Sequence, residues 1–241
     1  MLFTEALFAE PLLTELEITA LVLSLKVALV ASLSILPIGI ALAWVLAKKE
    51  FYGKSLLDGV IHLPLVLPPV VIGYVLLILF GKQGPIGLWL DTYLGIDFSF
   101  SWKGAALASA VVALPLMVRS IRLSILSVDT KLEEAAMTLG AAPFTVFRRI
   151  TLPLMMPGVI SGLVLAFARS LGEFGATITF VSNIPGETQT IPLAMFSFLE
   201  TPGAEFQAMR LCILAIIIAL ISLFFSEWLS RRSHQKLGLL K

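Results

Sequence analysis

The chain has 241 residues, of which 58% are hydrophobic and only 14% are charged, and its formal net charge is +1. Soluble domains carry about 25% charged residues, so this composition excludes an ordinary soluble fold and predicts an all-α, polytopic membrane protein. The balanced charge gives no indication of nucleic-acid binding, and the single cysteine, Cys212, excludes an internal disulfide and a cysteine-based metal site.

Five apolar stretches are long enough to cross a lipid bilayer, because a helix needs about 20 mainly apolar residues to span the hydrocarbon core. They cover approximately residues 18–47, 59–80, 104–123, 154–178 and 211–229. The sequence contains no internal repeat, low-complexity tract or linker to a soluble domain. Residues 1–241 are therefore expected to form one transmembrane domain, a bundle of about five helices.

Lysine and arginine predict the orientation, because they are enriched on the cytoplasmic side of a membrane protein. With the N-terminus outside, three would face outwards (Lys82, Lys103 and Arg210), and Lys26 and Arg169 would lie within spans. The other twelve would face the cytoplasm: Lys48, Lys49, Lys54, Arg119, Arg122, Lys131, Arg148, Arg149, Arg231, Arg232, Lys236 and Lys241. We therefore predict a multi-pass protein of the bacterial inner membrane type, with its N-terminus outside and its C-terminus in the cytoplasm.

The turn after the first span, Gly53-Lys54-Ser55, resembles the end of a phosphate-binding loop. Such a loop needs a preceding strand and a glycine five positions before Gly53, where this chain has Lys48. We therefore expect a polar turn, with no ATPase site, no catalytic residue, no metal site and no cofactor in this chain.

The second apolar stretch begins HLPLVLPPVVIGY and contains Pro64, Pro68 and Pro69. Proline removes a backbone donor and kinks a helix. Within a membrane, such interruptions are tolerated only where protein or water satisfies the freed carbonyls. The second span is therefore expected to be kinked.

A short polar segment at about residues 129–150 separates the third and fourth spans. Thr130 and Glu133 have the spacing of a capping box, and an apolar residue recurs at helical spacing at Leu132, Ala135, Ala136 and Leu139. Gly140 suits a left-handed helix end, and Pro143 suits the first position of a second helix. This pattern predicts a helix–turn–helix knob on the cytoplasmic side. From periodicity alone, an ordinary amphipathic loop at the membrane interface is an equal alternative.

The spacing within this segment is more specific than its periodicity. Its residues follow the pattern EAA, three residues, G, nine residues, I, one residue, LP, and they are Glu134, Ala135, Ala136, Gly140, Ile150, Leu152 and Pro153. This pattern resembles the coupling motif of ABC importer permeases, which have the MetI-like fold. The resemblance implies that the knob sits in a cleft of a cytoplasmic ATPase. Glu134 would pair with a basic group there, Gly140 would permit the turn, and Leu139 and Phe144 would fill the cleft.

Two charged residues, Arg169 and Glu173, lie within the fourth apolar stretch. Four residues apart, they would share one face of a continuous helix. Because a single charge is costly in lipid, they are predicted to form an ion pair that fixes helix packing. The alternative is that they line an anion path, with Arg169 attracting the anion.

Neutral hydrogen-bonding groups follow where the fourth span emerges: Thr177, Thr179, Ser182 and Asn183. They form a candidate gate region. Further along the same outer segment, residues 192–199 are predicted to form a short amphipathic helix lying at the surface.

Residues 168–192 read ARSLGEFGATITFVSNIPGETQTIP. Together with HLPLVLPPVVIGY and RSIRLSILSVD, this segment is similar to the molybdate permease subunits of ABC importers, and the resemblance runs from about residue 16 to residue 230. It implies translocation of molybdate, with tungstate as a close analogue. Sulfate or thiosulfate permeases share the Gly-Glu-Phe-Gly core, so a permease of that type stays the alternative.

The same resemblance implies the partners. They are a second copy of the chain in a homodimer, two cytoplasmic ABC ATPase subunits that bind ATP and Mg, an extracytoplasmic molybdate-binding protein, and the lipid bilayer. A self-sufficient secondary transporter or channel would instead show inverted repeats, and a membrane enzyme would show clustered His, Asp and Glu. The sequence shows neither pattern.

Overall fold

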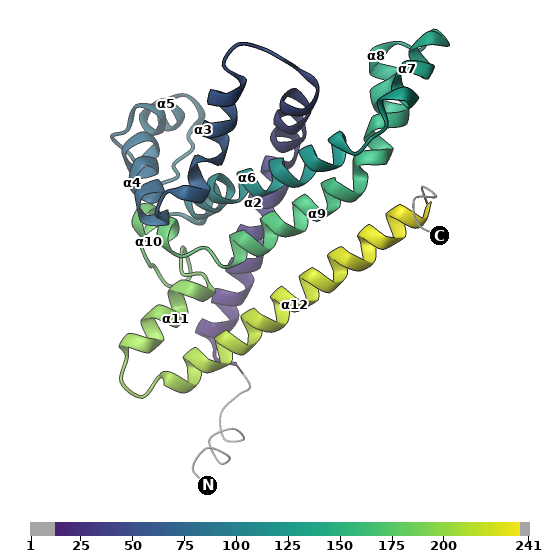
Figure 1. The fold of residues 1–241 in the computed structure, drawn as a ribbon. Coiled ribbons are helices and arrows are strands. Elements are labelled where there is room, and N and C mark those ends of the chain that lie inside the picture. The colour runs from purple at the N-terminus through teal and green to yellow at the C-terminus, as the bar shows by residue number, and fades with distance from the viewer. Residues whose placement is uncertain (1–12, 237–241) are drawn as a thin grey trace. The chain divides into compact units, whose positions relative to one another are not determined.

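Every regular element in the described part of the chain is a helix. The computed structural model describes residues 13–236 (Figure 1). In chain order the helices are α2 (Glu15–Lys48), α3 (Lys54–Val66), α4 (Pro69–Phe80), α5 (Pro85–Leu94), α6 (Trp102–Leu126), α7 (Thr130–Thr138), α8 (Pro143–Val146), the π-helix η1 (Phe147–Thr151), α9 (Leu152–Leu171), α10 (Gly175–Val181), α11 (Ile191–Glu200) and α12 (Glu205–Lys236). The predicted all-α fold is confirmed.

Within residues 13–236, four helical stretches are long and apolar enough to cross a membrane: α2, α6, the continuous stretch Pro143–Leu171, and the Glu205–Phe225 part of α12. The pair α3 and α4 makes a fifth if the two helices form one broken span. The predicted bundle of about five spans is confirmed, with two corrections. The second span is broken, not merely kinked, at Leu67 and Pro68, and the fourth ends at Leu171 instead of continuing to residue 178.

The described residues divide into two compact units. One, here called the α4–α10 unit, comprises residues 13–29, 68–109 and 171–218, and the other, the α7–α9 unit, comprises residues 30–67, 110–170 and 219–236. Helices α2, α6 and α12 contribute residues to both units. The expectation that residues 1–241 form one domain stays a prediction.

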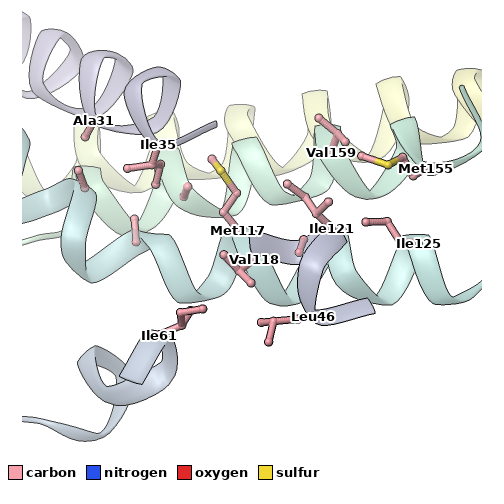
Figure 2. Packing of buried hydrophobic residues seen from close by; sticks show 14 residues of the cluster. Ala31, Ile35, Leu46, Ile61, Met117, Val118, Ile121, Ile125, Met155 and Val159 are labelled. Atoms are coloured by element: carbon pink, nitrogen blue, oxygen red, sulfur yellow. The ribbon is translucent and has the colours of Figure 1, made fainter. Parts of the chain in front are cut away.

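The core of the α7–α9 unit is built from side chains of α2, α3, α6 and α9 (Figure 2). Met117 and Ile121 of α6 and Met155 of α9 are completely buried, and Leu46 of α2 and Ile61 of α3 belong to the same cluster. The side chains come from four elements, so this cluster joins α2 and α3 to the α6–α9 pair.

Close packing holds α6 against α9. A Cβ atom on Gly158 would lie 2.2 Å from Cβ of Ser124, so only glycine fits at this crossing. The hydroxyls of Ser120 and Ser124 donate to the carbonyls of Gly158 and Met155, at 3.0 and 3.2 Å. Between membrane helices, where lipid is as apolar as the side chains, such packing and hydrogen bonding replace the hydrophobic driving force.

In the α4–α10 unit, two short helices pack backbone against backbone. A Cβ atom on Gly73 of α4 would lie 2.5 Å from the carbonyl oxygen of Ala176 in α10, and one on Gly175 would lie 2.9 Å from Cβ of Pro69. Each of these helices begins just after a non-helical interruption, α4 after the end of α3 and α10 after the end of α9. The two helices that follow these interruptions thus form one tightly packed pair.

The remaining helices of this unit are short. α11 confirms the helix expected at residues 192–199, but it is packed rather than lying loose at the surface: Ile191 and Ala194 are buried with Ala20 and Leu211. The N–H of Ile191 donates to Ser24 Oγ at 2.6 Å. Sequence reasoning does not predict α5, because a ten-residue helix is too short to stand out as a span.

A buried ion pair ties the start of α2 to α12 in the α4–α10 unit. The Glu17 side chain is completely buried, and its carboxylate accepts from Arg210 Nε at 3.0 Å and Nη2 at 2.9 Å. The backbone N–H and the hydroxyl of Thr14 donate to the same carboxylate. Both carboxylate oxygens thereby have hydrogen-bond donors, which a buried carboxylate requires.

Candidate coupling surface

Helix α7 begins one residue earlier than its sequence pattern predicts. Asp129 is the N-cap residue, and its carboxylate accepts the backbone N–H of Lys131 at 2.9 Å. The predicted capping box between Thr130 and Glu133 is therefore wrong, because Asp129 takes the capping role and Glu133 is engaged elsewhere.

The carboxylate of Glu133 points into the α7–α9 unit. Its Oε2 accepts from Lys48 Nζ, at the last turn of α2, at 2.6 Å, and its Oε1 accepts from Thr151 Oγ1 at 2.6 Å. Burial by itself would raise the pKa of Glu133, but the hydrogen bonds from Lys48 and Thr151 and the charge of Lys48 together hold that pKa below its ordinary value. Glu133 is thus a charged side chain that holds α7 against Lys48 of α2 and Thr151 of η1.

The end of α7 is a Schellman motif. Gly140 has φ +85°, its N–H donates to the carbonyl of Met137, and the N–H of Ala141 donates to the carbonyl of Ala136. No heavy atom lies within 4 Å of where a Cβ on Gly140 would be. The requirement for glycine is therefore conformational rather than steric, as its place after the helix predicts.

The second helix of the knob, α8, begins with Pro143 at its first turn, as predicted. It passes into η1, a single turn of π-helix, and then into α9 without a break. Phe147 packs edge-on against Trp44 of α2, with ring centroids 6.5 Å apart. Phe144, one turn earlier, is 73% exposed. An apolar groove of about 470 Å³ runs beside these residues, lined by Pro37, Ile40, Ala41, Trp44, Pro143, Phe144 and Phe147.

The outer surface of the knob is unusually apolar for an exposed helix pair. No residue of α7 is fully buried, and Leu139 is 88% exposed. Glu134 and Ala135 are also exposed, and the other exposed large apolar side chains of the knob are Leu132, Met137 and Phe144. Met137 and Phe144 also line cavities that face α2. Exposed apolar patches of this kind mark interaction sites.

The three last residues of the predicted motif lie at the base of the knob. Ile150, Leu152 and Pro153 are half-buried, and Leu152 packs against the core of the α7–α9 unit. The motif therefore divides into an outer part, at Glu134, Leu139 and Phe144, and a base that joins the knob to α9.

The two charged residues predicted in the fourth span lie on either side of a helix break. Arg169 is in the last turn of α9, and Glu173 follows the end of α9 at Leu171. The expectation that one helix face carries both is therefore wrong. Glu173 is 2% exposed, and its Oε1 accepts the N–H of Ala176 at 2.9 Å, which caps the start of α10. An ion pair between Arg169 and Glu173 stays a prediction.

The candidate gate residues lie in and just after α10, where they hydrogen-bond within the α4–α10 unit. Thr179 donates to the carbonyl of Gly175 at 2.8 Å, and Asn183 donates to the carbonyl of Leu193 and to Ser197 Oγ. Thr177 is buried. Ser182 has φ +65°, a conformation that L-residues rarely adopt. A gate role for these residues stays a prediction.

Sequence reasoning missed the inner contacts of the knob, at Lys48, Glu133 and Thr151. The sequence pattern places Lys48 only on the positive side of the membrane and gives no role to Thr151, which lies between Ile150 and Leu152. The spacing of the motif contains no signal for these contacts, because Lys48 and Thr151 lie 85 and 18 residues from Glu133 in the sequence.

Comparison with known families matches residues 35–237 to the model of the binding-protein-dependent transport system inner membrane component. The chain is 66% identical, over 223 residues, to the molybdenum transport system permease protein ModB of Haemophilus influenzae, covering 92% of this chain and 97% of the relative. It is 60% identical to the protein of the same name from Escherichia coli K12, covering 94% and 99%. The sulfate transport system permease protein CysW of Escherichia coli K12 is more distant, at 36% identity over 88% and 72%.

Among solved structures, the chain is similar to a bacterial ABC transporter involved in the import of the acidic polysaccharide alginate. The TM-score is 0.71 at 20% identity, over 95% of this chain and 82% of that one. The methionine ABC transporter MetNI in an inward-facing conformation is also similar, with a TM-score of 0.65 at 15% identity, over 90% and 94%. At these identities the similarity concerns the fold alone.

Proposed function

The chain belongs to the family of binding-protein-dependent transport system inner membrane components, and we propose that it is the transmembrane permease subunit of an ATP-driven importer that translocates molybdate. The substrate assignment rests on the 66% identity to a molybdenum transport permease along nearly the whole of both chains. A sulfate- or thiosulfate-type permease is the weaker alternative, because the sulfate relative matches at 36%. Tungstate is the expected close analogue of the substrate.

The knob is the proposed contact with the ATPase. Its outer surface combines exposed apolar side chains at Leu139 and Phe144 with the carboxylate of Glu134, a combination that fits an apolar cleft with a basic group at its edge. Its base continues without a break into α9. Closure of two ATPases would therefore act on a rigid element, which suits transmission between two discrete arrangements.

ATP and Mg are proposed to bind only to the partner ATPase. The sequence Gly53-Lys54-Ser55 forms the turn before α3: Gly53 has φ +90°, and Lys54 Nζ pairs with Glu50 Oε1 at 2.6 Å. A lysine held by a neighbouring carboxylate in a turn between helices supports the reading of these residues as a polar turn.

The full assembly is proposed to contain two copies of the chain, two ATPases and one extracytoplasmic binding protein. Five spans hardly enclose a gated path, and a two-fold partner is the commonest solution. A separate binding protein would select the anion, so the path itself would need only transient attraction, to which Arg169 is the candidate contributor. A path that gripped a dianion tightly would release it slowly.

The proposed orientation places the knob in the cytoplasm. It rests on the twelve Lys and Arg predicted inside against three outside. Single cysteines at Glu187 and at the exposed Thr138, in a Cys212→Ser background, should react with an impermeant reagent from opposite sides of intact cells. Labelling of Thr138→Cys but not Glu187→Cys from outside would reverse the orientation.

The experiment that tests the substrate is uptake by cells lacking the gene, at limiting molybdate. Molybdate uptake should be lower in these cells than in the wild type. In wild-type cells, tungstate should compete with molybdate uptake and sulfate should not. Normal molybdate uptake combined with a sulfate requirement would reassign the chain to the sulfate type. Transport by the purified chain in liposomes without any ATPase would instead favour a secondary transporter or channel.

A further inference from the structure

Two adjacent carboxylates of the knob have opposite surroundings. Glu134 is exposed, whereas the Glu133 side chain is 13% exposed and bonded to Lys48 and Thr151. We propose that Glu133 is a positioning residue that ties the knob to α2, so that a movement imposed on the knob is passed to the first span as well as to α9. The proposal rests on the proposed function only in naming what imposes the movement.

The chain itself connects the knob to α6 through Asp129 and to α9 through η1, but not to α2. Lys48 precedes Glu133 by 85 residues, so any force on α2 must pass through noncovalent contacts. Of the contacts described between the knob and its base on one side and α2 on the other, the ion pair is the shortest, at 2.6 Å, and Phe147 adds an edge-on ring contact to Trp44.

The apolar contact between α2 and α8 is incomplete. The groove of about 470 Å³ lies between residues of α2, from Pro37 to Trp44, and residues of α8 and η1, from Pro143 to Phe147. Across this groove α2 and α8 are separated except where Phe147 meets Trp44, and atoms that are apart transmit no force. The charged contact lies at the end of α2, where Lys48 reaches Glu133.

The bonding geometry suits a mechanical link. One carboxylate oxygen takes the ammonium of Lys48, and the other takes the hydroxyl of Thr151, which is 2% exposed and lies where η1 joins α9. The single side chain of Glu133 thus bridges α7, α2 and the start of α9. Charge-assisted bonds in a partly buried site are stronger and more directional than neutral ones.

The test uses the complete transporter, purified with its ATPase and binding protein and reconstituted in liposomes. Glu133→Gln and Lys48→Met should each lower the molybdate transported per ATP hydrolysed by about fivefold or more, the lower end of typical coupling between sites. The charge exchange Lys48→Glu with Glu133→Lys should restore most of that ratio. The matched control is Glu50→Gln with Lys54→Met, an equally short ion pair whose carboxylate is 88% exposed, and it should change nothing.

A second readout needs no transport. Spin labels at Ile38→Cys on α2 and Thr138→Cys on α7, in a Cys212→Ser background, should give one narrow distance distribution within a copy, measured on permease in which the labelled chain is diluted with unlabelled chain. Glu133→Gln should lose the narrow peak, and the charge exchange should regain it. An unchanged distribution in Glu133→Gln, or an exchange no better than the single variants, would overturn the proposal. If Glu133→Gln loses the narrow peak but the wild-type complex transports no molybdate, the proposed substrate is rejected and the role of Glu133 in positioning the knob against α2 stands.

Discussion

The outer and inner sides of the knob use the same kinds of residue for different purposes. On the outer side, a carboxylate and large apolar groups, Glu134, Leu139 and Phe144, are exposed. On the inner side, the carboxylate of Glu133 and the ring of Phe147 are bonded and packed against α2. Residue type alone therefore does not distinguish a partner contact from an internal anchor, and burial does.

The largest effect is expected from Gly140→Val, because the turn between α7 and α8 positions both the outer and the inner side of the knob. The left-handed conformation at φ +85° costs a β-branched residue on the order of 1–2 kcal/mol or more. The Schellman bonds to Ala136 and Met137 would be lost, and α8 would leave its position. Binding-protein-stimulated ATP hydrolysis and uptake should fall together by about tenfold or more, while the permease is still inserted at normal abundance.

The control for this variant is Gly140→Asn, because asparagine tolerates the left-handed region better than valine does. It should retain much more transport. Equal stimulation in wild type and Gly140→Val would mean that the segment is only a surface loop.

Glu134→Lys tests the outer side of the knob alone, because it leaves the inner contacts of Glu133 unchanged. It should place like charges together at the proposed contact and weaken ATPase binding by about tenfold or more, since like-charge juxtaposition costs several kcal/mol at an interface. Co-purification of the ATPase with the permease at rising salt measures this. Glu50→Lys makes the same charge change outside the knob and should leave ATPase binding as in wild type; a similar loss in both variants would contradict a specific role for Glu134.

Truncating the exposed apolar groups tests the outer side with less disturbance. Leu139→Ala and Phe144→Ala should each lower ATPase affinity by about 1–2 kcal/mol, and thermal stability of the permease should change little, because these side chains are 88% and 73% exposed. Leu46→Ala is the matched control: this leucine is 1% exposed, so its loss should destabilise the fold by about 2–5 kcal/mol. If Leu139→Ala destabilises as much as Leu46→Ala, the outer side is an internal packing surface.

The smallest effect is the pH dependence of the inner side. The pKa of Glu133 is lowered in the folded protein, so its ion pair contributes stability that is fully present above the ordinary value of 4.5 and is lost as the pH falls through the lower folded value. Hydrogen-exchange protection of α7 should therefore be constant from about pH 7 to pH 5 and decline only below that. Glu133→Gln should remove this acid decline, and a decline above pH 5 that persists in Glu133→Gln would show that another group controls it.

Much of the fold could be predicted because membrane insertion depends on local composition. A run of about 20 apolar residues predicts a span. The predicted stretches match α2 and α6 within about three residues at each end, whereas α12 (Glu205–Lys236) extends beyond the predicted 211–229 at both ends. The end of the fourth span could not be predicted in this way. Hydropathy continues through Phe174 and Ala176, whereas the chain leaves the helix after Leu171 and begins a new one at Gly175, where the N–H of Ala176 donates to Glu173.

The sequence by itself determined the class of the protein, the approximate places of its spans and the position of the knob. Gly140 and Pro143 act through backbone conformations that depend on their own residue type, so they could be placed without a structure. Only the tertiary structure decided which of the two glutamates faces inwards. That choice depends on Lys48 and Thr151 meeting α7 across 85 and 18 residues of chain, and adjacent residues on a helix point about 100° apart, so one of them is left outside once the other is bound.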